Sequence, residues 1–131
     1  MLKESIICII IVISILFGNY KIQDYTKESV SKITASINEL RNEIIKDEKE
    51  INREEVQEKM DEVSRKWEER HDILAYFIEH DELEKVETHF TSLKSYIQTE
   101  EFSESISELD EGEFILKHIE EKYAFSMENI F

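Results

Sequence analysis

Proline is absent from this chain, and Gly18 and Gly112 are its only glycines. Proline breaks helices and glycine enters the left-handed backbone conformations that many turns require, so few positions here force the chain out of a helix. Glutamate, lysine and leucine, which are strong helix formers, are abundant. The sequence therefore predicts an all-α protein, and its 131 residues suffice for one modest domain.

An uncharged apolar run extends over residues 5–17 and reads SIICIIIVISILF. At about 1.5 Å per residue it is shorter than the roughly 30 Å hydrocarbon layer of a bilayer, but Leu2 and Tyr20 extend it and Lys3 can snorkel to the surface. A cleavable signal needs a small residue at the third position before the cut, whereas Leu16 occupies that position if cleavage follows Gly18. We predict that residues 1–20 form an uncleaved membrane anchor; the alternatives are a cleaved signal peptide and a buried core helix.

Lysines flank this run on both sides, so the positive-inside rule orients it only weakly. The flank that precedes the run is very short, and such flanks usually stay in the cytoplasm. We therefore expect a single-pass protein of the cell membrane, with residues 21–131 outside the cytoplasm.

Apolar residues after the anchor recur at alternating intervals of three and four, the spacing of one helix face or of a short coiled coil. They are Val30, Ile33, Ile37, Leu40 and Ile44. Nothing interrupts the helix pattern, so we expect the anchor helix to continue as a stalk over residues 21–50. The apolar face of the stalk is covered either by later helices, which gives a closed monomer, or by a second chain, which gives a dimer. We favour closure, because three later helices offer apolar faces.

A helical hairpin is predicted over residues 53–98, because capping patterns begin at Asn52 and at Asp81 and apolar residues follow each at helical spacing. The apolar residues are Val56, Met60, Val63, Trp67, Leu74 and Ile78 in the first helix, and Leu83, Val86, Phe90, Leu93 and Ile97 in the second. A short corner near His80 requires the two helices to be antiparallel. At the end of the first helix, His80 would favour the negative end of the helix dipole.

A C-terminal helix is predicted over residues 103–122, with Ile106, Leu109, Leu116 and Ile119 on its apolar face. We expect it to continue through Gly112, because one glycine costs only ~1 kcal/mol in a helix. Ser126 resembles the cap of a terminal turn over residues 126–131. The expected fold is thus an N-terminal transmembrane helix that continues into an antiparallel bundle of about four helices.

The formal net charge of −15 repels nucleic acid phosphates and anionic lipid headgroups, so we expect no binding to DNA or RNA. The segment from Glu100 to Glu113 is rich in carboxylates and contains no lysine or arginine. It lacks the alternating oxygen ligands and the central glycine of a calcium loop. We interpret it as a solvated helix face.

Glu68 and His71 form a Glu-x-x-His pair, which puts a carboxylate and an imidazole on one helix face as in carboxylate-bridged two-metal bundles. Such sites need the motif twice, and it occurs once here. A nucleophile elbow, a P-loop and a dinucleotide fingerprint are absent, and the only cysteine, Cys8, lies in the apolar run. We expect no catalysis, no metal and no cofactor; the alternative is a metal-dependent helical-bundle enzyme that uses Glu68 and His71.

At Trp67, His80, residues 82–86 and the closing MENIF, the chain resembles a family of small bacterial proteins that is known only as a domain of unknown function. Members, mostly from anaerobic Gram-positive bacteria, pair one N-terminal membrane helix with a short acidic helical domain. The resemblance covers nearly the whole chain, and Gly112 is unusual for the last helix of the family. The genes often neighbour one for a multi-span membrane protein, so the resemblance implies such a protein as the partner.

The sequence thus predicts a membrane-tethered helical interaction or scaffold module. Its partners would be the lipid bilayer, through the N-terminal helix, and a membrane protein or a second copy of the chain as a homo-oligomer. The candidate interaction or structural residues are Ile33, Ile37, Leu40, Trp67, His80 and Phe90.

Overall fold

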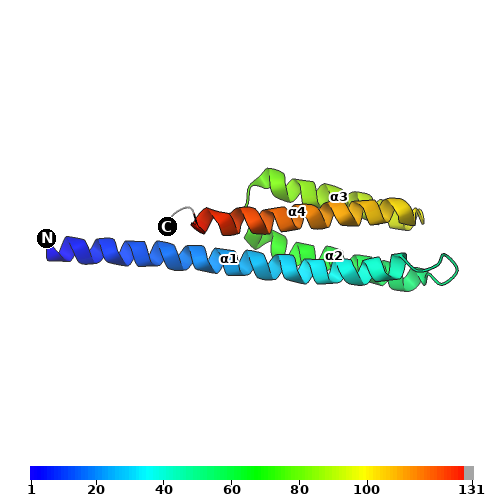
Figure 1. Cartoon of the computed structure of the whole chain (residues 1–131), viewed down its shortest axis with the longest axis horizontal. Coiled ribbons are helices and arrows are strands. Elements are labelled where there is room, and N and C mark those ends of the chain that lie inside the picture. Colours follow the sequence, from blue (N-terminus) through cyan, green and yellow to red (C-terminus); the bar gives the residue numbers. More distant parts are fainter. Residues whose placement is uncertain (129–131) are drawn as a thin grey trace.

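The structure is a computed structural model that describes the backbone of residues 1–128 and the side chains of residues 1–124. Within these residues the chain forms four helices: α1 (Leu2–Ile44), α2 (Arg53–Leu74), α3 (His80–Gln98) and α4 (Phe102–Glu128). α1 packs against α2 and α4, and α3 packs against the same two helices. Successive helices run antiparallel, with α1 and α2 in one layer and α3 and α4 in the other (Figure 1). The predicted all-α antiparallel bundle is confirmed.

α1 has two halves with different surroundings. Its N-terminal half extends beyond the end of the bundle, and its C-terminal half packs inside it (Figure 1). The prediction that the anchor continues into the stalk without a break is confirmed. The predicted end of the stalk at residue 50 is wrong, because α1 ends at Ile44 and a turn follows. Residues 46–50 are all charged, so no apolar face would hold a longer helix on the bundle.

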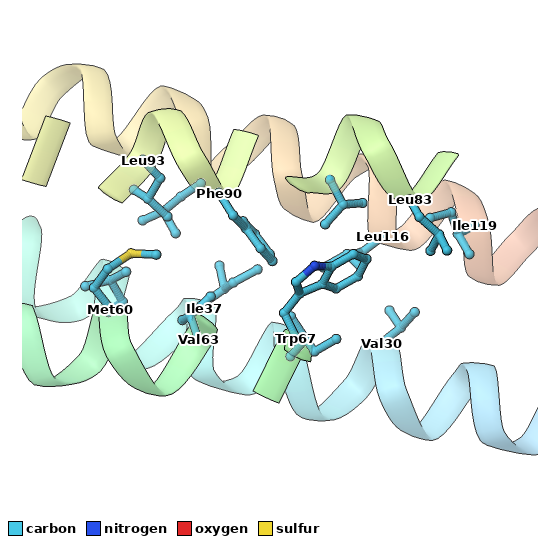
Figure 2. Packing of buried hydrophobic residues seen from close by; sticks show 14 of the residues in the cluster. Val30, Ile37, Met60, Val63, Trp67, Leu83, Phe90, Leu93, Leu116 and Ile119 are labelled. Atoms are coloured by element: carbon cyan, nitrogen blue, oxygen red, sulfur yellow. The ribbon is translucent and has the colours of Figure 1, made fainter. Parts of the chain in front are cut away.

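One hydrophobic core lies between the four helices, and it contains the whole apolar stripe of the stalk. Ile33, Ile37 and Leu40 have no exposed surface, and Val30 and Ile44 are each 3% exposed. Later helices of the same chain cover this stripe, so the predicted intramolecular closure is confirmed. The apolar faces predicted for the hairpin are buried as well: Val56, Met60, Val63, Trp67, Leu74, Ile78, Leu83, Val86, Phe90, Leu93 and Ile97. Figure 2 shows side chains from both layers of the bundle meeting around Trp67.

Of the two helix caps predicted for the hairpin, one is confirmed and the other is wrong. Asn52 caps α2 as expected, because its side chain accepts hydrogen bonds from the backbone N–H groups of Glu54 and Glu55. The predicted cap at Asp81 is wrong: α3 begins at His80, and Asp81 lies in its first turn. The corner is fixed by a tertiary contact instead, in which the backbone N–H of Glu79 donates to the Tyr123 hydroxyl of α4 at 2.9 Å.

α4 is longer than predicted. It begins at Phe102, passes through Gly112 without a break as expected, and continues past residue 122 to Glu128. Ser126 therefore lies inside the helix and caps no separate turn, while residues 129–131 of the predicted terminal turn lie outside the described residues. α1 supports the extension, because the Gln23 side chain donates to the carbonyls of Tyr123 and Ala124.

Candidate functional site

The most distinctive surface of the molecule is the N-terminal half of α1, which is apolar on every side and uncovered. Residues 1–15 are all exposed, and the large apolar side chains from Ile6 to Ile15 have exposed fractions between 49% and 59%. A helix that is hydrophobic all round is stable only when it is buried in a core or in a membrane. No other part of the described chain covers this one.

This segment has the length of a membrane span. From Leu2 to Tyr20 the helix is about 28 Å long at about 1.5 Å per residue, close to the roughly 30 Å of a hydrocarbon layer. α1 is long and apolar enough to cross a membrane, and none of its most apolar window is buried. The alternative of a buried core helix is therefore wrong. A secretory signal sequence has the same length and composition as an anchor.

The end of the span that joins the bundle has the side chains of a membrane interface. The Lys21 ammonium lies 5.5 Å from the centre of the Phe17 ring, and Tyr20 is 58% exposed. In a membrane, tyrosine and lysine at this position would place their polar tips in the headgroup layer and keep their apolar parts on the hydrocarbon side.

The six residues predicted as interaction or structural candidates fall into three groups. Ile33, Ile37 and Leu40 are core residues of the bundle and have no free surface. Trp67 and Phe90 are each 5% exposed and pack edge to face, with ring centres 5.8 Å apart. His80 is exposed at the start of α3, 4.0 Å from Glu84. The predicted position of His80 at the C-terminal end of the preceding helix is wrong, because α2 already ends at Leu74.

A groove that the sequence did not reveal runs between α2 and α3, the two neighbouring helices with the least extensive contact. Its volume is about 310 Å³, and it is lined by Ser64, Trp67, Glu68, Glu87, Phe90, Thr91 and Lys94. The indole N–H of Trp67 is buried beside it and has no hydrogen-bond partner. Helical spacing assigns Trp67 and Phe90 to the core, but it gives no sign that α2 and α3 separate there.

In the fold, Glu68 and His71, the residues of the alternative metal site, have different neighbours. His71 lies 3.3 Å from Glu87 of α3 and 3.4 Å from Asp72, so its ring nitrogens face carboxylates other than that of Glu68. Glu68 is exposed at the rim of the groove. Over the part of the chain that the structure describes, no three histidine, cysteine, aspartate or glutamate side chains converge as metal ligands would.

The carboxylates of the acidic segment from Glu100 to Glu113 are mostly solvent-exposed, in line with its interpretation as a solvated face, but several of them also pair with other helices. Arg41 of α1 binds Asp110 at 2.8 Å and Glu113 at 2.6 Å, and His89 of α3 lies 2.7 Å from Glu108. Arg53 of α2 pairs with Glu100. Because their partners lie far away along the chain, the sequence pattern of this segment did not reveal these pairs.

Arg41 and Glu113 are the most enclosed of these pairs. Burial on its own raises the pKa of Glu113, but hydrogen bonds from Arg41 and Lys117 outweigh it and leave the pKa below the ordinary 4.5. Burial likewise lowers the pKa of the Arg41 guanidinium, and its hydrogen bonds to Glu113 and Asp110 outweigh that effect and raise it. The pair is therefore ionised at neutral pH and joins the middle of α1 to α4.

Comparison with known proteins assigns the folded part of this chain to a protein family. Residues 20–130 match a family whose description is domain of unknown function (DUF4363). The match begins where the apolar span ends, and it takes in the C-terminal half of α1 and all of α2 and α3. No curated protein and no solved structure matches the chain. The resemblance to an uncharacterised family is thereby confirmed, and the chain belongs to the family described as domain of unknown function (DUF4363).

Proposed function

We propose that this protein is a membrane-tethered helical interaction module. The apolar half of α1 spans the membrane, and the bundle binds a membrane-protein partner beside it. The observation that carries the proposal is the uncovered apolar surface of residues 2–20 on a helix that continues without a break into the core of the bundle. In water this surface would remain exposed at a cost of about 25 cal/mol per Å².

The continuity of α1 supports a scaffold role. Helix α1 has no loop between the span and Val30, the first core residue of α1, so the bundle does not swing on a flexible linker. A rigid connection keeps the binding surface at a fixed height above the bilayer, where a membrane-embedded partner can reach it. A long flexible linker would spread the bundle over a much larger volume.

The groove between α2 and α3 is the proposed contact surface for this partner. The stalk stripe is already buried, so it is not available to a partner or to a second copy. The groove is lined by two aromatic rings that are each 5% exposed, and the unpaired indole N–H of Trp67 is buried beside it, so an acceptor that enters between α2 and α3 would satisfy it. Aromatic side chains with one polar group are enriched at the centres of protein interfaces.

The tether is tested by fractionating membranes that contain the full chain. The chain should sediment with membranes and resist both high salt and carbonate, because its attachment is apolar rather than electrostatic. Residues 21–131 serve as the control and should remain in solution. Recovery of a soluble mature form that begins near Asn19 would contradict the proposal and identify a cleaved signal sequence.

The contact surface is tested with a photo-crosslinking side chain at Thr91, on the rim of the groove. The matched control carries the same group at Glu111, which is exposed on α4. We expect an adduct with one integral membrane protein from position 91 only, and its loss when Lys94→Glu alters the rim. Equal adducts from both positions would contradict a partner site in this groove.

A further inference from the structure

The corner between α2 and α3 lies close to the end of the span. Phe77 of the corner packs edge to face against Tyr25 of α1, with ring centres 6.4 Å apart. Tyr25 follows Tyr20 by five residues, which is about 7.5 Å along the helix axis. The corner and the described end of α4 both face the side from which the N-terminal half of α1 emerges (Figure 1).

This position along α1 puts the α2–α3 corner at the level of the lipid headgroups. The span of residues 2–20 fills the hydrocarbon layer, and the polar layer beyond it is roughly 5 to 7.5 Å thick on each side. A corner held about 7.5 Å beyond Tyr20 therefore lies at the outer part of that layer.

The side chains exposed at the corner are of types that are found at membrane–water interfaces. Tyr76 is 89% exposed and Ile73 is 47% exposed: their backbones close the turn, with the Tyr76 N–H donating to the Ile73 carbonyl at 3.2 Å, while their side chains stay accessible. Beyond the span, and among the side chains that the structure describes, the other large apolar ones with comparable exposure are Ile45 and Phe114. Tyrosine is enriched at membrane interfaces because its ring is apolar and its hydroxyl remains hydrated.

The charges around the corner indicate which lipid fits. Arg70 lies over the Tyr25 ring and near Glu28, so its charge is already engaged. Asp72 is exposed, and Glu79 pairs with Lys122. With no free cationic cluster there and a net charge of −15, an attraction to anionic lipids is not the source of contact. A zwitterionic headgroup layer, which accepts tyrosine and isoleucine without requiring charge, fits best.

We propose that the α2–α3 corner, through Ile73 and Tyr76, inserts into the zwitterionic headgroup layer of the same membrane that holds α1. This inference rests on the proposed tether and adds a second membrane contact to it. Two contacts hold the bundle against rotation about the α1 axis, so the groove of Trp67 keeps a constant orientation to the membrane. That groove lies on α2 about 9 Å farther from the bilayer than Ile73, since six residues separate them.

The inference is tested with the full chain in phosphatidylcholine vesicles. Trp67→Phe removes the only native tryptophan, and a new tryptophan is placed either at the corner, by Tyr76→Trp, or at the opposite end of the bundle, by Ile45→Trp. Both positions are exposed, at 89% and 60%. Each protein is first floated with the vesicles, and its emission is then measured with phosphatidylcholine that carries a nitroxide quencher on the headgroup.

We expect both proteins to float, the tryptophan at 76 to lose at least half of its emission to the headgroup-labelled lipid, and the tryptophan at 45 to be unaffected. Flotation with an equal loss of emission at both positions, or with no loss at either, would overturn the corner contact and leave the tether intact. A chain that does not float would overturn both. If Trp67→Phe fails to fold, Tyr76→Cys and Ile45→Cys in a Cys8→Ser chain carry nitroxide labels, and only label 76 should be protected from a water-soluble relaxation agent.

Discussion

The ring of Phe90 on α3 lies directly against Gly112 on α4. A β-carbon at position 112 would be 3.0 Å from Cε1 of Phe90, tighter than ordinary van der Waals contact. Glycine therefore lets α3 and α4 approach closely at this point, and Phe90 in turn packs edge to face against Trp67, with ring centres 5.8 Å apart. The glycine that looks like a possible helix break in the sequence is instead a packing residue.

Gly112→Ala is expected to destabilise the bundle by about 1 kcal/mol. Alanine favours the helix by ~1 kcal/mol, but Phe90 is 5% exposed and packs against Trp67, so it can move only at the expense of that contact, and overpacking by ~1 to 3 kcal/mol outweighs the gain. Denaturation of residues 21–131 in urea measures the change, since this fragment contains the whole core. In a Phe90→Leu background the same substitution should become stabilising; a stabilising effect in both backgrounds would contradict the close contact.

Ile37→Glu is expected to cost more than about 4 kcal/mol in the same fragment, because a carboxylate would be buried without a partner. Ala35→Glu, two residues away on the exposed face, is the matched control and should change the stability by less than about 0.5 kcal/mol. Sedimentation should show a wild-type monomer. A wild-type dimer that Ile37→Glu converts into an equally stable monomer would mean that a second chain covers the stalk.

Trp67→Ala is expected to lower the free energy of unfolding by ~3 to 5 kcal/mol, because it leaves a cavity between the two layers. Trp67→Phe should cost less, since the indole N–H has no hydrogen-bond partner to lose. Thermal unfolding followed by circular dichroism measures both. If the Ala variant melts at the wild-type temperature, Trp67 is an interface residue and not a core residue.

Acid should weaken the bundle through Glu113. Its pKa is lower in the folded protein than in the unfolded chain, where it returns to about 4.5, so the unfolded state binds the proton more tightly. The stabilisation is complete above pH 4.5 and is lost as the pH falls through the folded pKa. Stability measured between pH 7 and pH 3 should therefore fall less steeply for Glu113→Gln than for the wild type, while Glu111→Gln on the exposed face should follow the wild type.

The expected orientation of the bundle is testable with a single cysteine. Cys8 lies in the span, so Cys8→Ser combined with Ser107→Cys leaves one thiol, on the exposed face of α4. A membrane-impermeant maleimide added to intact cells should label it if residues 21–131 are outside the cytoplasm. Labelling only after the cells are opened would place the bundle in the cytoplasm.

The faces of the helices were readable from the sequence because each helix buries one stripe at the spacing of its own turns. Val30 to Ile44, and the stripes around Trp67 and Phe90, are buried as that spacing predicts. The cap at Asn52 was readable as well, since it depends only on residues within one turn. These features are local, so neighbouring residues suffice to specify them.

Features that join distant segments were decided by the tertiary structure. The start of α3 one residue before Asp81 depends on the Tyr123 hydroxyl of α4, and the pairing of the acidic segment depends on Arg41 and Arg53 of earlier helices. The loose contact of α2 with α3 and the height of the α2–α3 corner at the end of the span also arise only when the four helices pack. The sequence by itself determined the helices and their buried stripes, because helical periodicity is a local property. The assembled bundle determined which surfaces remain uncovered, because those depend on which faces the packing buries.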